Sequence, residues 1–365
     1  MVTRNRGVIM TPLLKLLDIN LDIVAIIDDY ETLYFEEKFA DVGECKIEIS
    51  ADSENFKSIQ KNMFIYLDKY RCWFIEDIDI SEGKATLSCL ALSFIFSHRV
   101  IIPPVGKSHL QISNKLTGEI AKAFIDSCLV KATDKSRNIP LVFESYKVGH
   151  KAIYESRYEN LLSELQVLAT YSSFGFKLGI DIKNRNYVCS LYEGRDMTEE
   201  IIFSEEFDNI DDVKISDSNS GYKNTVYIAA DGEGSNRNIQ KMAIGDFSGF
   251  MLREDIIEAQ IDKETDEEGN EIPVDVANTI EITGLEFLEE NCEKTSIEAI
   301  LLNTVEEIEV GDIVTIKSKR YGLQLTQRII EVNTEYTVEN GKSIGIVVGT
   351  QKPTLTFETE KNEIK

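Results

Sequence analysis

The residues most often used for catalysis and metal binding are few in this chain, and they are scattered. Its three histidines, His98, His109 and His150, form no His-Glu-x-x-His motif and no pair with metal-ligand spacing. The six cysteines form no Cys-x-x-Cys pair, and several, such as Cys89, lie among apolar strand-type residues. Such cysteines are typical of buried thiols in a protein made in a reducing compartment. We therefore predict no metal site, no cofactor and no catalytic residue.

Two segments resemble ligand-binding loops only superficially. Residues 231–236 read Asp-Gly-Glu-Gly-Ser-Asn, without the third glycine or the Lys-Ser/Thr pair of a phosphate loop, which favours a β-turn. The acidic run from Asp262 has Glu267 where an EF-hand needs glycine and Pro273 where it needs glutamate. Paired carboxylates of a glycosidase remain open, because 64 acidic residues make such pairs inevitable.

The charge of the chain limits its partners. Its formal net charge is −25, and residues 253–309 contain 19 acidic and 3 basic residues. A negative field repels phosphate backbones, so we expect no sequence-specific nucleic-acid binding. The same segment contains a predicted acidic hairpin, which either faces a channel or a partner or only keeps the surface soluble, with the candidate residues Glu264, Asp266, Glu267, Glu268 and Glu271. No segment approaches the roughly 20 apolar residues of a membrane span, and the N-terminus lacks a signal peptide, so no membrane anchoring is expected.

The elements that must position any site are mostly strands. Residues 44–50 alternate apolar and charged side chains, and residues 73–80 and 85–92 flank a Ser-Glu-Gly-Lys turn that is typical of a hairpin. After a Pro-Pro break, residues 112–130 have a helical pattern with Ser113 or Asn114 as the cap, and residues 158–171 form a second helix. A second hairpin is predicted over 175–192, and strands continue from Ile201 to Gly349, with one short helix over 283–293.

These patterns predict a mainly β protein with an α/β insert, of the α+β class, in which two small β-barrel domains flank the inserted region. The predicted division is a first β-barrel-type domain over 1–103 and an inserted α/β domain over 107–200. A strand-rich connecting region with the acidic hairpin follows over 201–294, then a second β-barrel-type segment over 295–350 and a C-terminal tail over 351–365.

The two ends of the chain repeat one pattern. Residues 62–67, 73–78 and 86–90 are apolar runs separated by a basic turn and a Glu-Gly-Lys turn. Residues 311–316, 327–332 and 343–348 follow in the same order, with a basic turn and a Glu-Asn-Gly-Lys turn between them. Any two β-meanders share some of this pattern, but the order and spacing favour a duplicated small β-barrel, whose closure would remove exposed strand edges.

On these segments, together with Phe96-Ser97-His98-Arg99-Val100-Ile101, the chain resembles the tail-hub or baseplate-hub proteins of phage tails and contractile bacteriocins, including the Gp37-like siphophage family. The resemblance covers most of the chain but rests on pattern and order. It implies a homotrimer in which each protomer contributes two barrels. Six similar barrels would then match a six-fold tail tube, and the three-fold side would meet a spike.

The function implied is that of a non-enzymatic structural hub with an axial channel. Its expected partners are the tail tube protein, the spike protein and other baseplate proteins. We expect synthesis in the bacterial cytoplasm and incorporation into the tail tip or baseplate of a virion or related particle. Two other interpretations stay open at this point: a cell-wall-degrading enzyme of a phage tail, and a receptor-binding module.

Overall fold

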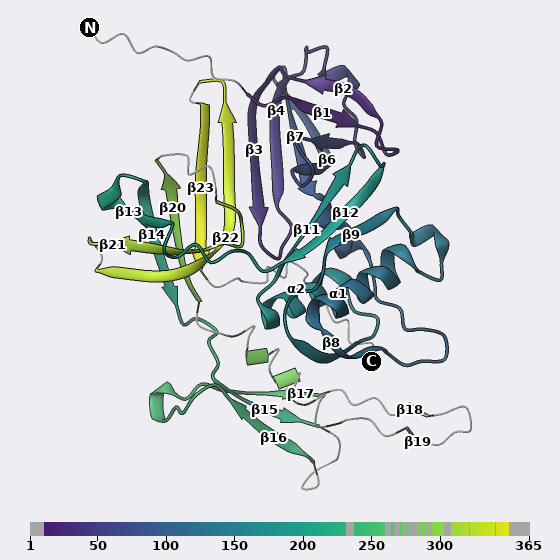
Figure 1. The fold of residues 1–365 in the computed structure, drawn as a ribbon, viewed down its shortest axis with the longest axis vertical. Helices are drawn as coiled ribbons and strands as arrows, with labels where there is room; N and C mark the ends of the chain where they lie inside the picture. The colour runs from purple at the N-terminus through teal and green to yellow at the C-terminus, as the bar shows by residue number, and fades with distance from the viewer. Residues whose placement is uncertain are drawn as a thin grey trace.

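The computed structural model describes residues 11–230, 237–259, 294–302, 308–320, 322–339 and 341–349, together with short pieces between 264 and 291. Strands dominate these residues, and the helices α1 and α2 lie together on one side of the molecule (Figure 1). The mainly β class is therefore confirmed. Single-turn and irregular helices connect the strands, namely η1 (Phe56–Ser58), η2 (Leu92–His98), η3 (Asp126–Val130), η4 (Lys135–Arg137), η5 (Glu205–Phe207) and η7 (Gly249–Met251).

The N-terminal strands form one curled sheet, which we call unit 1. Its order is β3-β4-β7-β6-β5-β1-β2. Inward side chains alternate along these strands and pack around Trp73, whose ring lies 4.9 Å from that of Phe35. The strands are β1 (Leu14–Leu17), β2 (Ile23–Ile27), β3 (Tyr30–Lys38), β4 (Glu44–Ser50), β5 (Phe64–Tyr66), β6 (Cys72–Ser81) and β7 (Lys84–Ala91).

The α/β insert follows unit 1 and shares a core with it. The helix predicted over 112–130 begins only at Thr117, because residues 110–116 are extended and pair with residues 151–156. The cap predicted at Ser113 or Asn114 was therefore wrong. The second helix is capped by Asn160, whose side chain accepts hydrogen bonds from the next turn. The elements are β8 (Leu110–Leu116), α1 (Thr117–Ile125), β9 (Leu141–Ser145), β10 (Lys151–Ser156), α2 (Leu161–Ser172), β11 (Gly175–Asp181) and β12 (Asn186–Tyr192).

A second curled sheet, unit 2, combines strands from both sides of the acidic region. Its order is β14-β20-β23-β22-β21-β13, around a core that includes Phe203, Ile297 and Val314. Its strands are β13 (Ile202–Ser204), β14 (Ile210–Ser218), β20 (Lys294–Leu301), β21 (Ile313–Ser318), β22 (Leu323–Thr337) and β23 (Gly341–Gly349).

A small three-stranded sheet is inserted into unit 2 between β14 and β20. Its order is β16-β15-β17, and Val226 and Ile228 of its central strand are fully buried. It lies at the lower end of the molecule in Figure 1. The strands of this region are β15 (Thr225–Ala229), β16 (Ile239–Ala243), β17 (Glu254–Glu258), β18 (Glu264–Thr265) and β19 (Glu271–Ile272). Much of the helix predicted over 283–293 lies outside the described residues.

The two units share one topology. The orders β3-β4-β7-β6-β5-β1 and β14-β20-β23-β22-β21-β13 match strand for strand, and the equivalent strands also follow the same order along the chain. The repeat predicted from the sequence is thus confirmed in the strand order. The last pairs differ, because β1 pairs antiparallel with β5 whereas β13 pairs parallel with β21.

Neither sheet is closed by strand pairing among the described residues. The end strands of unit 1 are β2 and β3, and those of unit 2 are β13 and β14. In unit 2 the side chain of Asn209, the residue before β14, contacts β13: Ser204 N donates to Asn209 Oδ1 at 2.8 Å, and Asn209 Nδ2 donates to the carbonyl of Ile202 at 2.8 Å. The two sheets instead merge into one continuous sheet, because β3 of unit 1 pairs with β22 of unit 2.

Candidate assembly interface

The junction of the two units is built on the 15-residue strand β22. Its first half pairs with β21, and its second half continues between β23 and β3. The pairing with β3 is antiparallel and runs from Glu331 opposite Lys38 to Thr337 opposite Thr32. One further backbone hydrogen bond extends it, from Phe39 N to the carbonyl of Ile330 at 3.0 Å. Because strand edges carry unpaired backbone groups, this pairing satisfies an edge of each unit.

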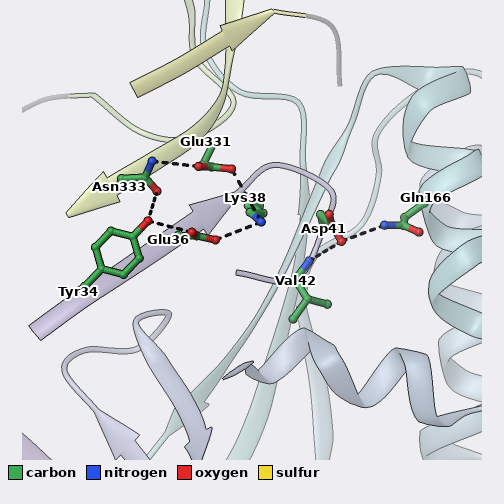
Figure 2. Close-up of polar contacts among 8 residues, drawn as sticks. All are labelled: Tyr34, Glu36, Lys38, Asp41, Val42, Gln166, Glu331 and Asn333. Atoms are coloured by element: carbon green, nitrogen blue, oxygen red, sulfur yellow. Dashed lines mark hydrogen bonds and ion pairs between the residues drawn. The ribbon is translucent and has the colours of Figure 1, made fainter. Parts of the chain in front are cut away.

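A polar network lies on one face of this junction (Figure 2). Lys38 Nζ lies 3.1 Å from Glu36 Oε2 and 3.8 Å from Glu331 Oε2, so one ammonium forms ion pairs with carboxylates from both units. The Tyr34 hydroxyl donates to Glu36 Oε1 at 2.8 Å and lies 3.3 Å from Asn333 Oδ1, while Asn333 Nδ2 donates to Glu331 Oε1 at 2.9 Å. The three charged side chains are between 17% and 24% exposed, so their charges are poorly screened by water.

Burial and neighbouring charges shift the titration of this network. Burial raises the pKa of Glu331 above its usual value, although Asn333 and Lys38 oppose the change. Burial alone would lower the pKa of Lys38, but Glu36 and Glu331 outweigh it and raise that pKa. Lys38 therefore stays charged at neutral pH and holds two carboxylates that would otherwise repel each other.

The other side of the junction contains a polar cavity of about 590 Å³. Arg71 of unit 1 crosses it, with Nε 3.1 Å from Glu37 Oε2 and Nη1 3.3 Å from Asp68 Oδ2. Charges of both signs line the cavity, contributed by Glu37, Asp68, Arg71, Lys177, Glu309 and Lys342. Glu37 and Asp68 are thus paired with a guanidinium of their own unit, an arrangement that favours a structural role for these carboxylates over acid–base chemistry.

The insert is fastened to the same junction through unit 2. Asp312 is 1% exposed at its side chain, and its carboxylate accepts from Arg195 Nε at 3.0 Å and from Arg195 Nη2 at 2.6 Å. Burial opposes ionisation of Asp312, but the hydrogen bonds from Arg195 and from the Glu309 backbone outweigh it and lower its pKa. Paired in this bidentate way, the buried charge fixes the direction of the chain between the insert and unit 2.

Phe39 lies where unit 1, the insert and unit 2 meet. The guanidinium of Arg328 stacks 4.5 Å from the centre of its ring, and the ring of Tyr192 meets it edge-on at 5.5 Å. Gly311 approaches the same ring so closely that an added Cβ would lie 2.7 Å from Phe39 Cε2. This packing leaves no room for sliding between the three parts.

The residues singled out from the sequence lie elsewhere. Glu264 lies in β18 and Glu271 in β19, and these strands pair antiparallel with Thr265 opposite Glu271. Asp266, Glu267 and Glu268 lie outside the described residues. The structure therefore supports a hairpin here without placing its carboxylates. The junction residues, by contrast, carry no motif, and only the alternation of Leu33 and Phe35 with polar neighbours could have indicated β3.

The histidines do not come together. His98 lies edge-on to Phe94 at 5.1 Å between ring centres, and His150 lies 4.5 Å from the ring of Tyr171. Within the described part of the chain, no group of three His, Cys, Asp or Glu side chains could hold a metal ion. No described helix is long and apolar enough to cross a membrane.

Solved structures share this arrangement of strands. The 43 kDa tail protein of prophage MuSo2 from Shewanella oneidensis superposes with a TM-score of 0.56 at 14% identity, over 92% of this chain and 96% of that one. The prophage tail protein gp18 from Listeria monocytogenes EGD-e gives 0.56 at 10% identity, over 94% and 96%. The tail protein from Neisseria meningitidis MC58 gives 0.55 at 10% identity, over 92% and 96%. At these identities the shared property is the fold, which is that of phage tail proteins.

A comparison of the sequence with protein-family models identifies the family. The family model described as Siphovirus ReqiPepy6 Gp37-like protein matches residues 13–350, nearly the whole chain. The chain therefore belongs to this family, and the resemblance found in its sequence is confirmed. No curated protein matches the chain by sequence.

Proposed function

We infer that this protein is a structural component of a phage-type tail and acts as a trimeric adaptor between a six-fold tail tube and a three-fold spike. The observation that carries the proposal is the repeat: two units with matching strand order lie side by side in one chain, joined by β3 and β22. Three such chains offer six equivalent units to one side while keeping three-fold symmetry on the other. Membership of the Gp37-like family supports a role in the tail.

Each unit acts in this proposal as a small barrel, although strand pairing leaves a seam in both. At one end of the seam of unit 2, the side chain of Asn209 bonds to β13, and every strand of each unit contributes side chains to its core. We also propose that the chain is divided into a first barrel, an insert, a connecting region and a second barrel. A structural role without catalysis agrees with the junction chemistry, in which acidic groups are paired with Arg71, Arg195 and Lys38.

The ring would enclose an axial channel, and we propose that the acidic hairpin faces this channel or a neighbouring tail protein. A negative wall repels acidic cargo and keeps it moving. The test replaces Glu264 and Glu271 with Lys, together with the three acidic residues between them, and measures cargo release from assembled particles. Unchanged release with normal assembly would remove the channel role of this segment.

The adaptor role is tested by the mass of the purified protein and by its binding to tail components. We expect a particle of about three times 41.3 kDa in mass photometry, and binding of the tube protein to one side of that particle. A protein that stays monomeric at all concentrations, or a trimer that binds no tube protein, would contradict the proposal. Hydrolysis of purified cell walls by the protein would instead support the enzyme interpretation.

A further inference from the structure

In the described part of the chain, the second half of β6 in unit 1 and β14 in unit 2 are open strand edges, in addition to the outer edges of β2 and β13. The second half of β6, from Glu76 to Ser81, pairs with β7 on one side only. These residues are exposed except for Ile78, and Ile80 is 62% exposed. In unit 2, β14 pairs with β20 and forms the end of the continuous sheet. Open edges of this length are uncommon in soluble proteins and invite pairing with another chain.

The repeat assigns an equivalent to each open edge, and a shared bulge and a shared hydrogen bond support the alignment. Both β6 and β22 carry a bulge at the same place, after Ile75 opposite Cys89 and after Ile329 opposite Val348. Ile75 also donates to the carbonyl of Met63 at 2.9 Å, just as Ile329 donates to the carbonyl of Asp312 at 2.7 Å. The second half of β6 is therefore equivalent to the second half of β22.

A second pair of equivalent positions supports this alignment. Asn62 precedes β5 and has a φ of 67°, and Gly311 precedes β21 with a φ of 101°. The N–H of Asn62 donates to the carbonyl of Ile75 at 3.1 Å, and the N–H of Gly311 donates to the carbonyl of Ile329 at 2.7 Å. A positive φ and the same hydrogen bond thus recur at matching positions, which agrees with the alignment.

Within one chain, the edge of β22 is paired with another strand, whereas the equivalent edge of β6 is not. In unit 2 the second half of β22 is covered by β3, the end strand of unit 1. The strand equivalent to β3 is β14, since both form the end of their unit and pair with equivalent strands, β4 and β20. The exposure of equivalent residues differs accordingly. Thr334 on the covered strand β22 is 5% exposed, whereas Ile80 at the same position of the uncovered strand β6 is 62% exposed.

We propose that β14 of one copy pairs with the second half of β6 of the next copy, repeating between chains the junction that β3 and β22 form within one chain. The inference rests on the trimer of the proposed function and supplies its interface. The in-chain register places Glu331 opposite Lys38 and Glu335 opposite Tyr34. Transferred through the repeat, it places Asp77 opposite Ser218, Asp79 opposite Ser216 and Ser81 opposite Lys214.

The side chains at these positions are complementary. Lys214 takes the place of Tyr34, and Asp79 takes the place of Asn333, a pair that lies 3.3 Å apart within the chain. A cation and a carboxylate thus replace two neutral groups. Lys214 is 69% exposed and lies 3.1 Å from Glu298 of its own sheet, so it is free to bridge to a second acid.

The apolar face of the same edge agrees. Ile80 comes opposite Ile215, in the place where Thr334 meets Phe35 within the chain. The pairing would cover Ile80, the most exposed apolar residue of β6. Because different edges meet, the contact is head-to-tail, and such contacts close into rings when the rotation per copy fits. Because each chain contributes two units, a ring of three copies contains six units.

Crosslinking tests the register. In a chain with Cys292→Ser, Asp79→Cys and Ser216→Cys are combined and treated with a short bis-maleimide, since the other five cysteines are buried. We expect covalent trimers from the double variant and none from either single variant. Co-expression of the two single variants should give a covalent pair of unlike chains. The control, Asp79→Cys with Asp211→Cys, moves one partner about 16 Å along the strand and should not crosslink.

Charge exchange tests the side chains. Asp79→Lys and Lys214→Asp should each weaken the trimer about fivefold or more in dissociation constant, and the double variant should recover most of the loss. Recovery by Glu298→Lys with Lys214→Asp instead would show that only the in-chain pair matters. A trimer of normal mass without the expected crosslinks overturns the register alone. A protein that never forms trimers overturns the proposed function as well.

Discussion

Replacing Lys38 with Met tests whether the polar network holds the two units together. The change keeps most of the apolar stem and removes the ammonium that lies 3.1 Å from Glu36 and 3.8 Å from Glu331. Breaking a fully buried pair costs roughly 3–5 kcal/mol, and partial exposure reduces this, so we expect a loss of about 2 kcal/mol in the free energy of unfolding at pH 7. Urea denaturation followed by Trp73 fluorescence measures this loss, since Trp73 lies in the core of unit 1.

The pH dependence separates charge repulsion from lost packing. Burial already raises the pKa of Glu331, and without Lys38 it would rise further. A carboxyl whose pKa is raised in the folded state stabilises that state as the pH falls. The deficit of the Lys38→Met variant should therefore shrink between pH 7 and pH 5. An equal deficit at both pH values would refute the electrostatic argument.

Lys57→Met is the matched control for this experiment. Lys57 pairs with Glu54 at 2.5 Å, but the two side chains are 60% and 87% exposed. An exposed pair contributes little, so we expect a change below about 0.5 kcal/mol. A loss as large as that of Lys38→Met would mean that the position of the lysine at the junction is not what matters.

Two further predictions concern the contacts of the insert and unit 2. Gly311→Ala should cost about 2–3 kcal/mol, because the new Cβ would lie 2.7 Å from Phe39 at a φ of 101°. Gly322→Ala, at a φ of 63° with nothing within 4 Å, should cost only about 1 kcal/mol, and equal losses by thermal melting would contradict this account. Asp312→Asn should cost about 3 kcal/mol at pH 7, since it unpairs Arg195. The lowered pKa of Asp312 means that its contribution is lost as the pH falls through that pKa, so variant and parent should converge in acid-denaturation curves.

Local patterns in the sequence were enough to predict the hairpins. The strand pair β6–β7 turns at Glu82 and Gly83, both with positive φ, and the predicted Ser-Glu-Gly-Lys turn contains both residues. The repeat was visible for the same reason, since β5–β6–β7 and β21–β22–β23 are both meanders with local turns. Structural features that depend only on residues close in the sequence can be predicted from local sequence patterns.

The junction could not be predicted in this way. Tyr34 and Asn333 are 299 positions apart, and the charged end of β3 looks like a solvated turn until β22 covers it. The misplaced start of α1 has a similar cause. The helix was predicted to begin at residue 112, but pairing with β10 makes residues 110–116 extended. Tertiary pairing overrides local preference at both places.

The repeat also shows where this architecture accepts additional sequence. In unit 1, β3 and β4 are joined by a short connection whose Asp41 accepts a hydrogen bond from Gln166 of α2 at 3.0 Å. The equivalent connection of unit 2, between β14 and β20, has grown to contain a whole three-stranded sheet. Foreign modules, such as a label or a targeting domain, should therefore be inserted after β14. Unit 2 already contains an inserted three-stranded sheet at this position, and its own sheet remains intact.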